Sequence, residues 1–179
     1  MPVSRSRKHR SAGRLAAVAR KLLGDSTLCA IATVAPRGRA YVNTAYFAFS
    51  DDLDIVWWSS PDATHSRNIR ATGSAAVAVY RSTQTWGNPD RGIQLFGTAR
   101  QVAGSAADDA EQLYAARFPG YHQAELSAPY GLYVLRPQRI KLFDEREFGT
   151  AVFVTARVER GGRLAWQRTE VYRQDTNVR

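Results

Sequence analysis

The chain has 179 residues, 44% hydrophobic and 11% aromatic, with one cysteine and a formal net charge of +9. This length suits a single domain with one hydrophobic core, and no apolar run is long enough to cross a bilayer. A single cysteine excludes an internal disulfide and a thiolate zinc site. Charged residues interrupt the first hydrophobic stretch, so we expect no signal peptide and predict a cytoplasmic protein without a membrane partner.

Basic residues gather at both ends of the chain. No acidic residue stands among the five basic ones of residues 1–14, which are Arg5, Arg7, Lys8, Arg10 and Arg14, and arginines recur from Arg157 to Arg179. Short basic ends without interleaved aromatic residues are typical of solvated tails. We therefore expect a basic flexible tail at 1–13, a folded unit at 14–145, and an extension at 146–179 that packs on this unit or on a partner subunit.

The first half of the chain predicts a helix followed by three strands. Apolar residues recur at helical spacing from Leu15 to Leu23, and Gly24 follows as a stop. Residues 27–34 and 39–49 predict a hairpin around the turn at 36–38, and residues 53–58 predict a third strand joined by a short turn.

The second half continues with short strands and two short helices. Ser60 is predicted to cap a helix with Pro61 at its first position, and Gly73 to end it. Strands are expected at 75–80 and 92–102, the second with a bulge or a close backbone approach at Gly97, and Ser105 is expected to cap another helix. Residues 130–135 and 139–143 predict a strand pair or one bent strand, and residues 150–158 a last strand.

Six or seven strands in hairpin-like succession, with three short helices that do not alternate with them, predict a mainly β fold. The pattern fits an antiparallel β-barrel or a sandwich and not a parallel α/β sheet, and of the first two we expect the barrel. Closure would cover the edges that residues 75–80 and 92–102 would otherwise expose.

The passage from the third strand into its helix predicts an anion site. Residues 58–69 combine hydroxyls, an imidazole and a guanidinium with a helix start, where free amide groups carry a partial positive charge. A capped surface helix with a solvated basic face would fit the same twelve residues.

Three segments together resemble the pyridoxamine 5′-phosphate oxidase-like superfamily of flavin-binding split barrels, over about residues 14–144. They are YVNTAYF at 41–47, IVWWSS at 55–60 leading to HSRNI at 65–69, and RGIQLFGTA at 91–99. The resemblance implies that 14–145 is an FMN-binding split barrel of six to seven strands. It also implies a homodimer with FMN, or the related deazaflavin F420, between its subunits.

Carried over by position, the resemblance implies ten cofactor-binding residues. Asn43, Thr44 and Ala45 would lie along the isoalloxazine and ribityl chain, while Trp58 and Ser59 match the pair that precedes the phosphate helix. Thr64 and His65 match positions where the family's oxidases place an arginine and a lysine. The full set is Asn43, Thr44, Ala45, Trp58, Ser59, Ser60, Thr64, His65, Ser66 and Arg67.

The leading functional hypothesis is an FMN-dependent oxidoreductase that acts on a small-molecule substrate as a homodimer. A flavin performs the redox chemistry itself, so no acid, base or metal ligand is required, and we assign no catalytic residue. The alternatives are an F420-dependent split-barrel reductase and a flavin- or haem-binding protein without turnover. Nucleic-acid binding through the basic ends is the least favoured hypothesis.

Overall fold

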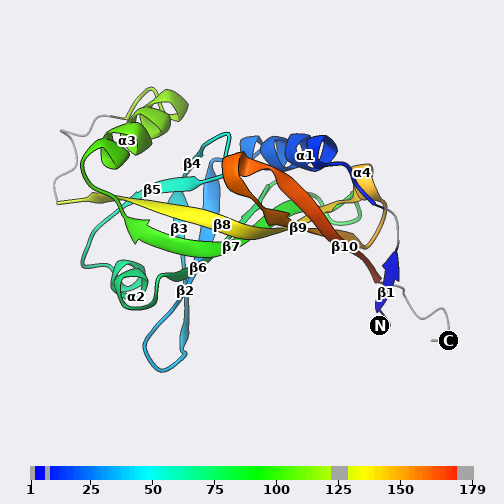
Figure 1. Cartoon of the computed structure of the whole chain (residues 1–179), viewed down its shortest axis with the longest axis horizontal. Helices are drawn as coiled ribbons and strands as arrows, with labels where there is room; N and C mark the ends of the chain where they lie inside the picture. The colour runs from blue at the N-terminus through cyan, green and yellow to red at the C-terminus, as the bar shows by residue number, and fades with distance from the viewer. Residues whose placement is uncertain (1–2, 7–8, 122–128, 173–179) are drawn as a thin grey trace.

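The structure, a computed structural model, describes residues 3–6, 9–121 and 129–172. Its strands form one ten-stranded antiparallel sheet in the order β1-β10-β9-β8-β7-β6-β2-β3, with β5 on β8 and β4 on β5 (Figure 1). The strands are β1 (Val3–Ser6), β2 (Leu28–Val34), β3 (Ala40–Tyr46), β4 (Ala48–Phe49), β5 (Ile55–Ser59), β6 (Ser74–Tyr80), β7 (Arg91–Gln101), β8 (Gly131–Asp144), β9 (Val152–Val158) and β10 (Leu164–Tyr172).

Four short helices and one 3-10 turn accompany the sheet in the described residues. They are α1 (Ala12–Gly24), α2 (Thr64–Thr72), α3 (Ser105–Arg117), α4 (Glu145–Phe148) and η2 (Arg160–Gly162). The predicted mainly β, antiparallel class is therefore confirmed. None of the helices in the described ranges is long and apolar enough to span a membrane.

The long strand β8 organises the sheet. Residues 131–135 of β8 pair with β5, residues 133–144 pair with β7, and residues 139–143 pair with β9. Predicted as a pair or one bent strand, this region is a single strand, with a register shift opposite Gly97 that confirms the expected bulge. β8 thus joins the strands of the barrel to β9, β10 and β1, of which β10 and β1 were not predicted.

The predicted hairpin at 27–49 forms with one interruption. β2 pairs with β3 from Leu28 opposite Tyr46 to Val34 opposite Ala40. The second arm then breaks at Phe47, a fully buried residue whose amide donates to the carbonyl of Thr27. The two residues after the break form β4, which pairs with β5 instead. The predicted strand at 39–49 is therefore two strands.

The main core lies between α1 and the inner face of the sheet. The apolar stripe predicted on the first helix is buried, with Leu15, Ala19 and Leu23 completely inaccessible. α1 packs on β6, β7 and β10, and Figure 1 shows it lying along one side of the sheet. Its first turn is capped by Ser11, whose hydroxyl accepts from the amide of Arg14.

A second apolar cluster lies beneath α3. Ala110 and Tyr114 of this helix are buried against β4, β5 and β8. The helix begins at Ser105 with Gly104 at the N-cap, so the prediction that Ser105 caps it is wrong by one position. The guanidinium of Arg117, at the end of the helix, stacks on the ring of Phe47, 4.6 Å from its centroid.

Parts of both predicted terminal regions have regular structure. Residues 3–6 form β1 and pair with β10, from Val3 opposite Tyr172 to Ser6 opposite Thr169. The predicted extension supplies β9, β10 and all of α4 but its first residue, Glu145, and its β9 pairs directly with β8. The domain boundaries stay a prediction, but segments from both ends extend the same sheet.

Candidate cofactor site

β5 leads into α2 through a turn at residues 60–63. The amide of Ala63 donates to the carbonyl of Ser60, and Ser60 Oγ accepts from the amide of Asp62 at 3.2 Å. α2 begins at Thr64, with Ala63 at the N-cap and no side-chain cap. The prediction that Ser60 caps this helix and Pro61 opens it is wrong, because the chain closes a turn before the helix starts. The first amides of α2 therefore lack a side-chain acceptor.

Two arginines of α2 fold back over this turn. Arg67 donates to the carbonyl of Asp62 and, at 3.2 Å, to Thr64 Oγ1. Arg70 donates to the carbonyl of Pro61 at 2.8 Å. Both side chains are exposed, so their cationic groups stand in solvent at the positive end of the helix dipole. This arrangement suits a phosphate or another anion.

His65 and Ser66 lie on the inner side of the same turn. His65 is 8% exposed, and its Nε2 shares a 2.5 Å hydrogen bond with Ser59 Oγ. Burial lowers the pKa of His65, so the imidazole favours its neutral form. Ser66 is completely buried and donates to the carbonyl of Ser60 at 2.7 Å. These two residues hold β5 and α2 together, and the positive charge comes from Arg67 and Arg70.

α2 is fixed beside β2 and β3. Asn68 Nδ2 donates to Thr33 Oγ1 at 3.1 Å, and both side chains are buried. α2 also packs on β3, and β3 on β5. The elements that carry predicted site residues, β3, β5 and α2, therefore lie next to one another.

β3 is an end strand of the sheet and carries Asn43, Thr44 and Ala45. Asn43 Nδ2 donates to the carbonyl of Thr44 at 3.4 Å, whereas its buried Oδ1 has no hydrogen-bond partner among the described residues. Ala45 packs against the core. A buried, unpartnered acceptor beside a free strand edge fits a ligand that brings an N–H or O–H group.

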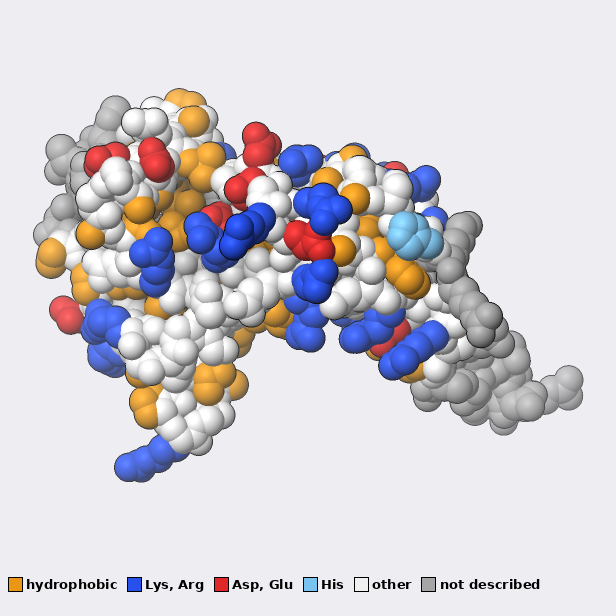
Figure 2. Space-filling model, viewed as in Figure 1, with side chains coloured by type: hydrophobic (Ala, Val, Ile, Leu, Met, Phe, Trp, Pro, Cys, Tyr) orange, Lys and Arg blue, Asp and Glu red, His pale blue; other side chains and the backbone are white. Residues whose placement is uncertain are grey.

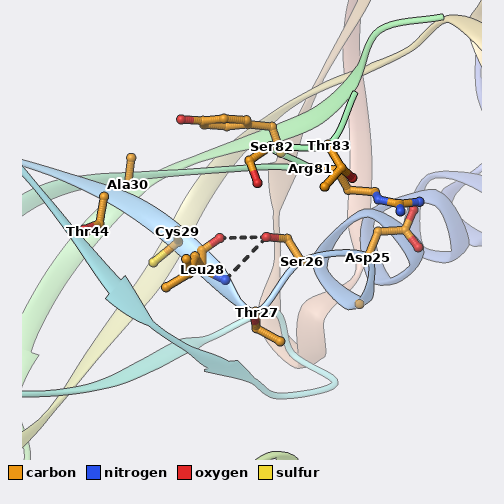
Figure 3. A pocket seen from close by; sticks show the side chains of 12 residues that line it. Asp25, Ser26, Thr27, Leu28, Cys29, Ala30, Thr44, Arg81, Ser82 and Thr83 are labelled. Atoms are coloured by element: carbon orange, nitrogen blue, oxygen red, sulfur yellow. Dashed lines mark hydrogen bonds between the residues drawn. The ribbon is translucent and has the colours of Figure 1, made fainter. Parts of the chain in front are cut away.

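Thr44 faces the opposite side of β3 from Asn43. There it lines a cavity of about 410 Å³, together with Leu28, Ala30 and Tyr80 (Figure 3). Ser26 closes one side, where it exchanges hydrogen bonds with the backbone of Leu28. The volume lies in the range of small-molecule sites.

Cys29 also borders this cavity, but it has no chemical role. It is 3% exposed, and burial raises the pKa of its thiol to about 12. The thiol therefore stays protonated and unreactive at neutral pH.

The two adjacent tryptophans of β5 face opposite sides, as the alternation of a strand requires. Trp57 is completely buried and stacks on Tyr133 at 5.8 Å between ring centroids. Trp58 is partly exposed and stacks on Tyr121 at 5.7 Å. Burial, with the nearby Glu111 carboxylate, raises the pKa of Tyr121 to about 12. Trp58 is thus the one of the pair that can meet a ligand.

One face of β2, β3 and β6 exposes apolar side chains, and we call it the outer face. Leu28, Val42, Tyr46 and Tyr80 are 47%, 62%, 58% and 52% exposed, and the strand registers place them on this face. The alanines of β2 and β6 form a flat strip between them. Exposed apolar area of this kind is typical of an interaction surface.

Sequence reasoning found most of these residues but missed Arg70. Its spacing of three from Arg67 places both on one helix face, so the helical period could have indicated it. Among the described residues, no cluster of His, Cys, Asp and Glu could hold a metal ion.

Comparison with known proteins agrees with this architecture. Residues 15–144 match the family model described as pyridoxamine 5′-phosphate oxidase. No curated protein matches the sequence.

Solved structures are similar to this chain in fold, at low sequence identity. A heme binding protein from Mycobacterium smegmatis is 18% identical with a TM-score of 0.65, over 90% of this chain and 59% of that one. An F420 reductase is 20% identical with a TM-score of 0.53, over 68% and 94%. A putative pyridoxamine 5′-phosphate oxidase from Listeria innocua is 13% identical with a TM-score of 0.58, over 72% and 97%.

The chain thus spans less than two thirds of the length of the M. smegmatis protein, and these likenesses carry the fold alone. The family model covers most of the chain and includes β2, β3, β5 and α2, the elements that build the candidate site. The chain belongs to the pyridoxamine 5′-phosphate oxidase family.

Proposed function

We propose that this protein binds FMN between two copies of the chain and acts as an oxidoreductase on a small-molecule substrate. The observation that carries the proposal is the pair Arg67 and Arg70, held over the uncapped start of α2 and beside the end strand β3. A phosphate at this point would meet two guanidinium groups and free backbone amides.

The residues at hand fit such a cofactor. Thr64, Arg67 and Arg70 would hold the phosphate, and the unpartnered Oδ1 of Asn43 would accept a hydrogen bond from the cofactor. Ser59, Ser60, His65 and Ser66 would act indirectly, because their mutual hydrogen bonds fix the junction between β5 and α2. When bound, a flavin supplies the hydride or electron transfer itself.

The outer face is the surface on which a second copy would pack. The second copy would cover Leu28, Val42, Tyr46 and Tyr80, and it would close the open side of the Thr44 cavity. Replacing Val42 with aspartate should then weaken the dimer, which analytical ultracentrifugation would detect. A wild-type chain that is monomeric at all concentrations would refute this part of the proposal.

The experiment that tests the cofactor is a titration of the purified protein with FMN, and separately with F420 and with hemin, followed by absorption spectra. The double variant Arg67→Gln and Arg70→Gln should bind FMN at least about tenfold more weakly, since a hydrogen bond to a charged group contributes about 1.5–3 kcal/mol. Arg100→Gln is the matched control, because Arg100 is exposed on β7 and its charge acts on the carboxylate of Asp54 and not on the turn at 60–63.

Each outcome decides between specific possibilities. FMN binding that is unchanged in the double variant would contradict the phosphate site. Stoichiometric binding of F420 or hemin, and not of FMN, would change the cofactor that we assign, in line with the F420 reductase and the heme binding protein of similar fold. FMN bound without oxidation of any donor would leave a flavin-binding protein without turnover.

A further inference from the structure

A second cavity lies on the outer face, at the other end of the alanine strip from the Thr44 cavity. It has a volume of about 490 Å³, and we call it the Arg139 cavity. Its floor is made of small side chains from three neighbouring strands, Ala32, Ala40 and Ala76, and Phe96 and Arg139 form one wall. A small floor beside an aromatic wall leaves room for a flat or aliphatic body.

A β-bulge shapes that wall. Phe96 of β7 lies opposite Arg139 of β8, whereas the next residue, Gly97, lies opposite Pro137, so Gln138 faces no residue of β7. Gln138 has no register partner on β9 either, where the pairing begins at Arg139. The bulge thus places a residue free of the ladder at the cavity, together with Gly97 and Arg139. Bulges of this kind often lie beside binding sites, where they redirect a side chain.

The charge at this wall is positive and incompletely balanced. The guanidinium of Arg139 stacks over the Phe96 ring, 4.7 Å from its centroid, and no carboxylate among the described residues lies within ion-pair distance of it. Its direct neighbour on β9 is another arginine, Arg157, which pairs with Glu159 instead. Like charges directly opposite each other destabilise a sheet. Figure 2 shows Lys and Arg side chains along the hollowed edge of the molecule beneath β9 and β10.

We propose that the Arg139 cavity binds a small organic anion, whose carboxylate pairs with Arg139 and whose apolar body lies on the alanine floor against Phe96. A carboxylate would supply the counter-charge that the protein does not provide, and it matches the planar fork of a guanidinium. A neutral molecule of the same shape would keep the apolar contacts but leave Arg139 without its partner.

As a binding site, the cavity is lined by residues of one chain, and in the proposed dimer it would lie at the edge of the interface that the second copy makes with the outer face. The inference that the cavity holds the substrate rests on the proposed function, and it assigns that substrate to the carboxylic acids. Because Arg139 is not part of the turn around α2, binding of a carboxylate and binding of FMN are separable in experiment.

The test uses the full chain, labelled with ¹⁵N, and two probes of the same shape, 2-naphthoate and the neutral 2-naphthamide. Amide shifts are followed by NMR in the wild type and in Arg139→Gln, with Arg100→Gln as the control arginine. We expect naphthoate shifts at Ala32, Ala76 and Gly97, and naphthoate binding at least about tenfold tighter than naphthamide binding. Arg139→Gln should abolish most of that preference, Arg139→Lys should restore part of it, and Arg100→Gln should change nothing.

Equal affinity for the two probes, an unchanged preference in Arg139→Gln, or shifts confined to other surfaces would overturn the proposal. Near-UV circular dichroism of each variant shows whether its packing is intact, so that a misfolded variant is not counted as a loss of binding. Naphthoate binding in a protein that fails to take up FMN would preserve the site and reject the proposed function. The reverse result would reject the site alone.

Discussion

Gly97 lies so close to the backbone of the neighbouring strand that any side chain at this position should destabilise the fold. A Cβ added at this position would lie 2.0 Å from the carbonyl oxygen of Arg136 and 2.8 Å from the Cα of Pro137. Both are backbone atoms of the paired strand, so no side-chain rotation can relieve the overlap. Gly97→Ala should therefore force β7 and β8 apart at the bulge. Overpacking of this kind costs about 1–3 kcal/mol of unfolding free energy.

Gly13 provides the matched control for this substitution. It lies in α1, and an added Cβ would meet nothing within 4 Å. Gly13→Ala should stabilise the protein by up to about 1 kcal/mol, because alanine restricts the unfolded chain and favours the helix. In thermal unfolding, Gly97→Ala should lower the Tm by roughly 2–12 °C at about 2–4 °C per kcal/mol, while Gly13→Ala should raise it slightly.

Urea unfolding, followed by tryptophan fluorescence, measures both variants on one scale. The buried Trp57, stacked on Tyr133 of β8, should report the transition. Equal midpoints for the two variants would refute the close approach of β7 and β8. Since Gly97 also lines the Arg139 cavity, Gly97→Ala should weaken naphthoate binding as well, while Gly13→Ala should not.

Three further predictions follow from single side chains. The pKa of His65 is lowered by burial, so as the pH falls the unfolded chain takes up a proton before the folded chain does. The free energy of unfolding should therefore fall as the pH drops below about 6.5, until the pKa of the folded state is passed. His65→Gln should flatten this part of the pH profile of the urea midpoint, and an unchanged slope would assign the pH dependence to another group. Arg117 donates to the carbonyls of Leu23 and Ser26, so Arg117→Met should lower the free energy of unfolding, measured in urea, by about 1.5–3 kcal/mol. A change under about 0.5 kcal/mol would show that water replaces the guanidinium as the donor to these carbonyls. Trp86 is fully exposed, at 101%, so Trp86→Ala should change stability by less than about 0.5 kcal/mol, and a larger loss would reveal contacts that the structure lacks.

Local patterns in the sequence predicted the elements that depend on local chemistry. β2 alternates between exposed and buried residues along its length, which is the signal that indicated the strand. Gly73 adopts a positive φ of 65° at the end of α2, as expected for a glycine that stops a helix. Gly97 marked a bulge because a strand has few other uses for glycine.

The start of α2 was mispredicted because its local signals fit two structures. Ser60 and Pro61 suit a tight turn as well as a helix start. The choice depends on Ser66 and His65, whose hydrogen bonds to Ser60 and Ser59 form only when the helix is in place. Local propensity gives no weight to these contacts.

β1 and β10 were missed because their partners are distant or weakly patterned. Val3 pairs with Tyr172, so β1 is stabilised by residues from the other end of the chain. β10 carries a register irregularity between Trp166 and Arg168 and a mixture of half-buried positions, which blurs the alternation. Of the basic residues that suggested solvated tails, Arg5, Arg157 and Arg168 therefore stand on paired strands.

This placement changes what the positive charge of the chain implies. Arg157 and Arg168 lie on neighbouring strands and are paired with Glu159 and Glu170, so they contribute little net field. Arg67, Arg70 and Arg139 instead meet only carbonyls, a hydroxyl or an aromatic ring in the described structure. A cation whose neighbours are neutral keeps its full attraction for an anion, and these three arginines lie at the two places where we propose that a ligand binds. The two proposed anion sites would therefore account for three arginines that no carboxylate balances in the described residues, and neither site requires a nucleic acid as the partner.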